Sequence, residues 1–331
     1  MIDNSNLTVM VAGGAGFVGS AIIRELLKLN AKVVCFDNYL HGIPENVEGL
    51  DNVEVVQGDA LNQLEIIDAI TRCDVKYIIN CIGDTYVPTA YKWPRRFFDI
   101  NLTACLNILE ACKICDVKRM LYVSSTEVYG ITEEETLDEY VSLKPVNTYA
   151  VSKLAADRLC YTYCIEHDVP VVTARIFNCY GPRESEPYII PEIIHQLNKG
   201  NVLRLGNIKA ERDFTYVHDT ARALIKVLFS NMENGDVVNV GSNTSFSVEW
   251  LANQIADIMN VKDLKIEVDT DRLRACDIDR FRCDNTKLKS ITDWQPEIDM
   301  IEGLKMTVDW FYKNDCKWSW ESFVKNSNIL K

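Results

Sequence analysis

The sequence predicts an α/β fold, in which a doubly wound parallel sheet is followed by a smaller, interwoven C-terminal α/β unit. Short runs rich in β-branched residues alternate with longer helical patterns through the first half of the chain, as in parallel strands joined by helical crossovers. The predicted strands are apolar throughout, which is expected when helices cover both faces of a sheet. Glycines also cluster where the first strand meets the first helix.

The elements of the first half follow one another at the spacing of βαβ units. We expect helices over residues 20–29, 63–71, 97–115 and 148–167. The strands are predicted at LTVMVAG, AKVVCFD, VEVVQGD, VKYIINC, VKRMLYVSS and VPVVTARIF.

The pattern changes after Asn178. We expect a helix in YIIPEIIHQLNKG, a strand at residues 236–241, a helix that Ser247 can cap, and a terminal amphipathic helix after DWQP. Because no long linker separates these pieces, the second lobe should be formed by several returns of the chain. We predict a first domain of residues 1–177 plus 213–241 and a second of residues 178–212 plus 242–331.

The composition excludes several classes of partner. A net charge of −13 and a pI near 4.9 argue against nucleic acid and anionic membrane surfaces, which both attract fields of Lys and Arg. No segment approaches the roughly 18 apolar residues of a membrane span. The polar start has too short an apolar run for a secretory signal, so we expect a cytoplasmic protein.

The twelve cysteines are scattered along the chain and are expected to be reduced. Cys112 and Cys115 form a lone Cys-x-x-Cys pair, which we interpret as helix packing instead of a metal site.

Gly13, Gly16 and Gly19 lie directly between a predicted strand and a predicted helix. Without Cβ atoms, this backbone can turn tightly and approach a pyrophosphate, whose charge then lies on the amides of the helix start. Asp37 ends the second strand, where a carboxylate accepts hydrogen bonds from a ribose and repels a 2′-phosphate. The sequence therefore predicts a Rossmann domain that binds NAD in preference to NADP.

Tyr149 and Lys153 are four residues apart at the start of a predicted helix, so both lie on one face. A neighbouring ammonium is expected to lower the pKa of the phenol and make it a usable base. Ser125, at the end of the fifth strand, can supply a companion hydroxyl.

At this point the chain resembles the extended short-chain dehydrogenase/reductase family, specifically its NAD-dependent nucleotide-sugar epimerases and dehydratases. The resemblance covers nearly the whole length and is carried by GGAGFVG, SSTEVYG, YAVSK, RIFNCYGPR, RDFTYVHD and RACDIDRFRCDNTK. It implies that Tyr149 takes the proton of the sugar 4-hydroxyl, that Ser125 binds the same oxygen, and that Lys153 holds the nicotinamide ribose. Hydride passes from C4 to NAD.

The resemblance also implies contacts with the cofactor and with a nucleotide-diphosphate sugar. Asn178, Arg212 and Arg274 are expected at the diphosphate, Asp277 at the nucleotide ribose, and Thr85 near the sugar. The further cofactor contacts it implies are Phe17, Val18, Asn38, Asp59, Ala60, Cys81, Gly83 and Asn101.

The segment NCIGDTYVPTA departs from the His-Leu-Ala-Ala type run of relatives. Gly83 keeps a close approach to the cofactor. Asp84, Tyr86 and Trp93 are either substrate-shaping residues or packing residues of this loop.

Glu127 bears on which reaction follows oxidation at C4. The new ketone acidifies the C5 proton, and a 4,6-dehydratase needs a base to remove it, whereas a 4-epimerase does not. Dehydratases and decarboxylases of the family carry a glutamate two residues before the motif tyrosine, as Glu127 precedes Tyr129. We therefore favour a 4,6-dehydratase that gives a 4-keto-6-deoxy sugar nucleotide, with Thr126 in the slot where one subgroup has an aspartic acid.

The alternatives are a 4-epimerase of the UDP-glucose or UDP-N-acetylglucosamine type, a uronic acid decarboxylase, a C4 dehydrogenase, and a non-catalytic nucleotide sensor. The alternative role for Glu127 is that of a salt-bridge partner with no part in the chemistry. Neither the base nor the sugar follows from the sequence.

In the family, the helices at 97–115 and 148–167 pair with their copies, which implies a homodimer. Four cysteines at helical spacings could permit that contact or could pack in the core of one subunit: Cys105, Cys112, Cys160 and Cys164.

Overall fold

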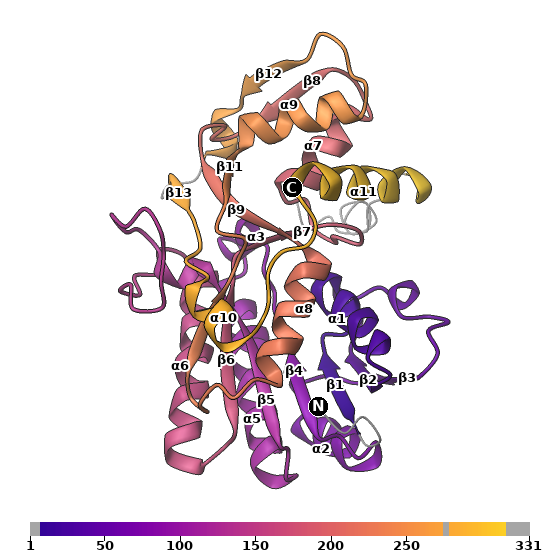
Figure 1. The fold of residues 1–331 in the computed structure, drawn as a ribbon, viewed down its shortest axis with the longest axis vertical. Coiled ribbons are helices and arrows are strands. Elements are labelled where there is room, and N and C mark those ends of the chain that lie inside the picture. Colours follow the sequence, from indigo (N-terminus) through magenta and orange to yellow (C-terminus); the bar gives the residue numbers. More distant parts are fainter. Residues whose placement is uncertain (1–6, 274–277, 316–331) are drawn as a thin grey trace.

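The computed structural model describes residues 7–273 and 278–315 (Figure 1). Its centre is a seven-stranded, wholly parallel sheet of order β10-β6-β5-β4-β1-β2-β3, which confirms the predicted doubly wound fold. The strands are β1 (Thr8–Ala12), β2 (Lys32–Asp37), β3 (Val53–Gln57), β4 (Tyr77–Asn80), β5 (Arg119–Ser125), β6 (Val171–Ile176) and β10 (Val237–Val240).

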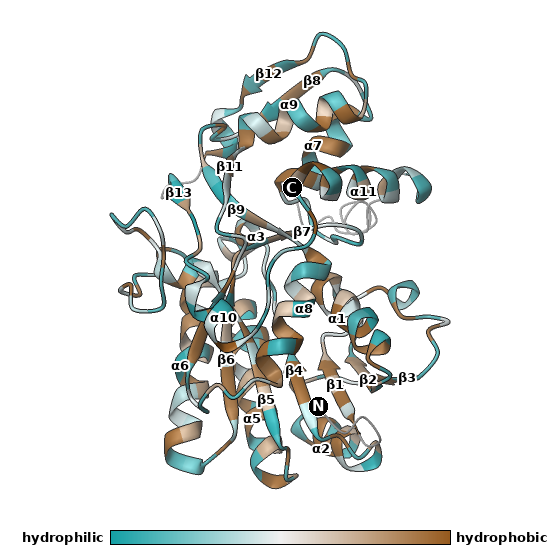
Figure 2. Ribbon diagram, viewed as in Figure 1, coloured by the Kyte–Doolittle hydropathy of each residue, from teal (hydrophilic) through white to brown (hydrophobic). Residues whose placement is uncertain are grey.

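Helices cover both faces of this sheet, so alternate residues of one strand enter two different cores. In β1, Val9 and Val11 pack on the face covered by α1 (Phe17–Lys28) and α8 (Val217–Leu228). Met10 and Ala12 face α2 (Gln63–Arg72), α5 (Ala104–Ile114) and α6 (Thr148–His167). Figure 2 shows the central strands largely in the hydrophobic colour.

The edge strand β3 departs from the expected uniform burial. Its Val55 is 45% exposed, and β3 is the end strand of the sheet, beside β2. A strand at the edge of a sheet has solvent beside it, so its pattern alternates more than that of a central strand.

The helix predicted at 97–115 begins earlier and is interrupted. Helix α4 (Pro94–Phe98) leads into a π-helical turn, η3 (Asp99–Thr103), which continues into α5. Such turns re-aim side chains and are frequent at functional sites. Here the turn carries Asn101, which is fully buried.

The second lobe has its own core, formed by α7 (Ile189–Leu197), α9 (Val248–Ile258) and α11 (Met300–Lys313) against two small sheets. Ser247 caps α9 as predicted, its hydroxyl accepting a hydrogen bond from the Trp250 amide at 3.1 Å. The small sheets contain β7 (Asn178–Tyr180), β8 (Val202–Leu205), β9 (Glu211–Tyr216), β11 (Ser245–Ser247), β12 (Lys265–Val268) and β13 (Arg280–Phe281).

The chain passes several times between the lobes (Figure 1). After β9 it enters the first lobe through α8 and β10, and later returns through α10 (Thr286–Ile291). Leu288 and Trp294 are buried in the core of the first lobe, although the predicted division assigns residues 242–331 to the second. A division that follows the packing moves α10 and Trp294 to the first lobe.

Shorter elements connect these parts: α3 (Val87–Ala90) and the 3₁₀ turns η2 (Pro44–Asn46), η4 (Thr126–Tyr129) and η5 (Thr270–Arg272). In the described ranges no helix is long and apolar enough to cross a membrane.

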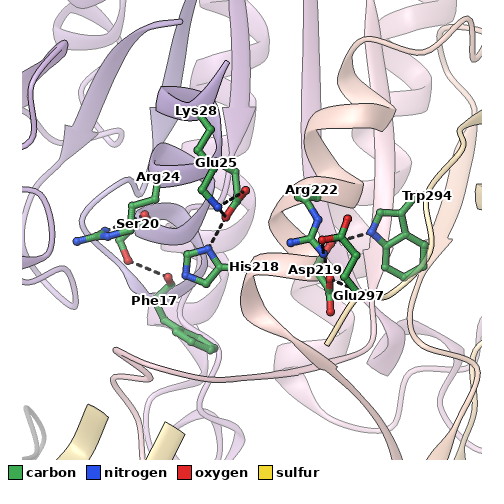
Figure 3. A network of polar contacts seen from close by, with 10 residues as sticks. All are labelled: Phe17, Ser20, Arg24, Glu25, Lys28, His218, Asp219, Arg222, Trp294 and Glu297. Carbon is green, nitrogen blue, oxygen red and sulfur yellow. Dashed lines mark hydrogen bonds and ion pairs between the residues drawn. The ribbon is translucent and has the colours of Figure 1, made fainter. Parts of the chain in front are cut away.

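Helix α8 is held on two sides by buried polar contacts (Figure 3). His218 meets Glu25 of α1 at 2.6 Å. Asp219, fully buried, accepts hydrogen bonds from the backbone amides of Glu297 at 3.0 Å and Ile298 at 3.1 Å, and its carbonyl accepts from the Trp294 indole at 2.9 Å. One turn of α8 therefore fixes both α1 and the segment that leads into α11.

We expect Asp219→Asn to lower the free energy of unfolding by about 1–3 kcal/mol, because an amide nitrogen would replace one oxygen of this buried carboxylate and the backbone amide of Glu297 or Ile298 would lose its acceptor. Urea unfolding followed by circular dichroism measures the change. The control is Lys226→Ala on the same helix. It removes an ion pair with the exposed Asp293 and should have little effect. Equal stability of the two variants would contradict the anchoring role of Asp219.

Candidate active site

The loop after β1 requires glycine at two positions because of its neighbours. Gly13 has φ +78°, and a Cβ there would lie 3.1 Å from the backbone of Cys81. A Cβ on Gly19 would lie 2.1 Å from the Gly13 carbonyl oxygen. Helix α1 can therefore start directly over the loop, after Gly16 at its N-cap, with the amides of Phe17 and Val18 in the first turn.

A cavity of about 430 Å³ opens at this point, where the strand order reverses between β1 and β4. Ligands of open α/β sheets bind at such a switch point. Eight of the predicted cofactor residues line it together: Gly13, Gly16, Asp37, Asn38, Asp59, Ala60, Cys81 and Gly83.

Asp37 is buried at the end of β2 and is held by two backbone amides. Its Oδ2 accepts from Ala15 at 2.9 Å and its Oδ1 from Tyr39 at 2.8 Å. Burial raises the pKa of Asp37, and the two amides oppose this. Asp59 accepts a hydrogen bond from Leu61 at 3.0 Å, so it is a turn residue that also lines the cavity.

Tyr149 and Lys153 lie on the buried face of α6, beside the end of β5. Burial raises the pKa of Tyr149; a hydrogen bond with Ser125 opposes the rise, while the carboxylates of Glu127 and Asp84 add to it. The expected lowering by Lys153 is not found.

Lys153 is turned toward the sheet instead. Its Nζ donates to the Val123 carbonyl at 2.6 Å and lies 4.7 Å from the centre of the Tyr122 ring. Burial lowers the pKa of Lys153 to about 8. A Cβ on Gly83 would lie 3.6 Å from this ammonium, so the loop after β4 closes directly over it.

Glu127 is half-buried and is tied to the start of α6. Its Oε2 accepts a hydrogen bond from the side-chain Nδ2 of Asn147 at 3.2 Å. The Oδ1 of Asn147 caps the helix by accepting from the Ala150 backbone amide at 2.8 Å. The backbone amide of Glu127 donates to the Ser125 hydroxyl at 3.2 Å. The carboxylate is thus close enough to raise the pKa of Tyr149.

Thr126, next to Glu127, is buried, and its hydroxyl has no hydrogen-bond partner among the described residues. A buried polar atom without a protein partner suits a position that contacts a ligand.

The Asn101 side chain has three protein partners. Its amide nitrogen donates to the Asp84 carbonyl at 3.0 Å and the Ser152 hydroxyl at 2.9 Å, and its oxygen accepts from the Asp84 amide at 2.7 Å. Because the side chain is committed to these partners, it positions the loop after β4 against α6.

The segment NCIGDTYVPTA, which differs from the run found in relatives, forms contacts near the cavity. Asp84 is buried and pairs with Arg96 at 2.7 Å, which itself lines the cofactor cavity. Thr85 meets the Tyr188 hydroxyl at 2.5 Å. Tyr86 packs edge-on against the Tyr188 ring, with centroids 5.9 Å apart, whereas Trp93 is half exposed.

The predicted diphosphate residues come from the second lobe. Asn178 begins β7, which pairs with β9 beside Phe214. Arg212 in β9 donates to the Glu211 carbonyl at 2.8 Å and lies over the Phe281 ring. Arg274 and Asp277 lie outside the described residues.

The cysteines of α5 and α6 pack inside the chain. Cys105 and Cys160 are buried with their sulfurs 3.8 Å apart, and Cys112 is 3.9 Å from the Met120 sulfur. They cannot lie on an intersubunit surface, whereas Cys164 is half-buried. Within 7–273 and 278–315, no three His, Cys, Asp or Glu side chains gather as a metal site would require.

Four residues near the cavity escaped the sequence reasoning: His41, Arg96, Glu186 and Tyr188. Arg96 lies in the basic pair of KWPRRFF, and Tyr188 in EPYIIP. The charge of Arg96 and the aromatic ring of Tyr188 were the available signals, but the neighbouring residues do not indicate what these side chains contact.

Residues 10–307 match the family model described as GDP-mannose 4,6 dehydratase. The chain belongs to this family. Its place among the nucleotide-sugar enzymes of the extended short-chain dehydrogenase/reductases, expected from the motifs, is thereby confirmed.

Curated relatives support the family over the full length. The low-salt glycan biosynthesis protein Agl12 of Haloferax volcanii is 31% identical over 93% of this chain and 100% of its own length. The GDP-6-deoxy-D-mannose reductase of Pseudomonas aeruginosa is 35% identical over 78% of this chain and 85% of its own. Other family members that match are named as a dehydratase, an epimerase and a decarboxylase.

Solved structures of the family have the same fold. The dTDP-glucose 4,6-dehydratase of Bacillus anthracis, in complex with NAD, is 27% identical with a TM-score of 0.85, covering 94% of this chain and 98% of its own. The UDP-glucose 4-epimerase of Thermus thermophilus, also with NAD, is 27% identical with a TM-score of 0.84, covering 92% and 99%.

The lowered pKa of Lys153 predicts a pH effect on stability. Between about 8 and its ordinary value of 10.5, the unfolded chain binds a proton that the folded chain does not, so this group increases stability as pH rises through that range. In the protein freed of cofactor, the free energy of unfolding relative to Lys153→Met should therefore increase from about pH 7 to about pH 10.

Urea unfolding at several pH values measures this difference. Lys118→Met, at an exposed lysine, is the control and should show the pH profile of the wild type. A Lys153→Met profile parallel to that of the wild type would show that burial does not perturb Lys153.

Proposed function

We propose that this chain is an NAD-dependent nucleotide-sugar 4,6-dehydratase. The observation that carries the proposal is the placement of Glu127, whose half-buried carboxylate is held by Asn147 at the start of α6 and acts electrostatically on Tyr149. A 4,6-dehydratase needs a base in addition to the tyrosine, and Glu127 has the position for it.

NAD is the cofactor. The glycine loop, the amides at the start of α1 and the carboxylate of Asp37 match its pyrophosphate and adenosine ribose. Held there, the cofactor would supply the hydride acceptor for C4 of the sugar and the hydride donor for C6.

The first steps fall to the end of β5 and the start of α6. Tyr149 removes the proton of the 4-hydroxyl, and Ser125 stabilises the same oxygen through a hydrogen bond. Burial opposes ionisation of the phenol, so the positive charges of Lys153 and of the oxidised nicotinamide have to favour the phenolate in the loaded site.

Elimination then falls to Glu127. It removes the C5 proton, which the C4 ketone has made acidic, and passes it to the departing 6-hydroxyl, so that water leaves. The hydride would then reach C6, a solvent proton would reach C5, and Tyr149 would release to solvent the proton that it took from the 4-hydroxyl. Thr126, whose buried hydroxyl has no protein partner among the described residues, binds the sugar during these steps.

The nucleotide diphosphate is held from the second lobe. We assign Asn178, Arg212 and Arg274 to the diphosphate and Asp277 to the ribose, since planar guanidinium groups bind such oxygens in pairs. Thr85, whose hydroxyl contacts the Tyr188 hydroxyl, is assigned to the sugar.

The functional form is a homodimer that pairs α5 and α6 with their copies. Exposed apolar side chains on these helices support it: Ile114, Val151, Tyr161 and Ile165.

Glu127→Gln should reduce turnover by about 10²–10⁴-fold, because the amide cannot remove the C5 proton. In heavy water the wild type should place one deuterium at C5 of the product, with loss of water from the sugar, both measured by mass spectrometry and proton NMR. Glu134→Gln makes the same charge change on an exposed residue seven positions on and should leave both unchanged.

A product of unchanged mass without deuterium would identify a 4-epimerase, loss of carbon dioxide a decarboxylase, and loss of two hydrogens a dehydrogenase. Each of these outcomes would overturn the dehydratase assignment.

A further inference from the structure

Four charged side chains meet at the outer wall of the cofactor cavity. Asp84 pairs with Arg96 at 2.7 Å, an Arg96 nitrogen lies 2.7 Å from His41 Nε2, and His41 Nδ1 lies 3.1 Å from Glu186. His41 Nε2 is also 3.8 Å from Asp84. We name this group the clasp.

The clasp joins parts of the chain that are distant in sequence. His41 follows β2, Asp84 follows β4 and Arg96 lies in α4, all in the first lobe. Glu186 precedes α7 in the second lobe. His41 and Arg96 themselves line the cavity, as do Gly42 and Asp99.

The burial of Asp84 makes its ion pair with Arg96 necessary. Asp84 is 1% exposed, and a carboxylate so far from water is tolerated only when a cation meets it. Arg96 supplies that cation, and its position is therefore fixed by Asp84. A positive group fixed in the wall of a cavity for a dinucleotide can attract the diphosphate without reorganising when the ligand arrives.

The contact of His41 with Arg96 depends on the charge of the ring, whereas its contact with Glu186 does not. Asp84 and Glu186 raise the pKa of His41 to about 9 against the effect of burial, which favours the charged ring. Two N–H groups cannot face each other at 2.7 Å. Protonation therefore separates His41 from Arg96 and leaves each cation with its own carboxylate, and the link from His41 to Glu186 persists in both states.

We propose that the clasp retains NAD in its cavity: Arg96, held by Asp84, attracts the cofactor diphosphate, and Glu186, through His41, fastens the second lobe to the rim of the cavity. The clasp concerns cofactor binding alone and does not depend on which sugar reaction the enzyme performs. In the proposed reaction it keeps the cofactor in place between the two hydride transfers.

The test is release of NAD in the absence of any sugar nucleotide. The full chain is loaded with radiolabelled NAD, diluted into excess unlabelled NAD, and the label that remains with the protein is followed by filtration. Glu186→Gln should release NAD at least about tenfold faster, because it removes the charge that ties the lobe to His41, a loss of about 1.4 kcal/mol.

The matched control is Glu192→Gln. Glu192 also forms an ion pair in the second lobe, with Arg272 at 2.9 Å, but Arg272, unlike His41, does not line the cavity. This variant should release NAD at the wild-type rate. His41→Gln tests the other side of the same contact and should behave as Glu186→Gln does.

Arg96→Met should weaken the equilibrium binding of both NAD and ADP-ribose, measured by calorimetry, because both ligands contain the diphosphate. Wild-type release from Glu186→Gln and His41→Gln, together with reduced thermal stability, would overturn the proposal and show that the clasp only joins the lobes. Unchanged ADP-ribose affinity in Arg96→Met would overturn the role of Arg96.

Discussion

The candidate site depends on the close approach of three backbone segments at the carboxyl end of the sheet. Gly13 lies against the backbone of Cys81, and Gly19 lies against the carbonyl of Gly13. A side chain at either glycine would push α1 or β4 away from β1. Because these contacts leave no space for a Cβ, the first turn of α1 opens onto the cavity, and Gly83 in the loop after β4 both lines the cavity and lies close to Lys153.

Buried polar side chains then set the position of the groups that face the cavity. Asn101 joins the loop after β4 to α6 through Asp84 and Ser152, and Asn147 joins Glu127 to the start of the same helix. Each of these amides has several protein partners, so a shift of one element would leave buried groups unsatisfied. Tyr149, Lys153 and Glu127 are therefore held relative to one another by residues that have no evident part in the chemistry.

The sequence was a good guide where the signal is local. Helix α6 spans the predicted residues 148–167, because its cap and its periodicity lie within one segment. The eight glycine-loop and strand-end residues that line one cavity follow from parallel topology, which brings strand ends together. Local sequence holds no signal where a side chain chooses between distant partners, as when Asn101 bonds to Asp84 and Lys153 to the carbonyl of Val123. The π turn before α5 also leaves no pattern that differs from that of a regular helix.

The segment that departs from relatives is best understood together with the segment that it meets across the site. Asp84 and Thr85 are consecutive, and they face Glu186 and Tyr188, which are two residues apart. Asp84 and Glu186 both contact His41 at the wall of the cofactor cavity, whereas Thr85 and Tyr188 contact each other at the position proposed for the sugar. Under the two proposals, each segment contributes one residue to cofactor retention and one to the sugar pocket. Because the paired residues are adjacent or two positions apart on one backbone, a change of loop conformation in either segment would move a residue of both proposed sites.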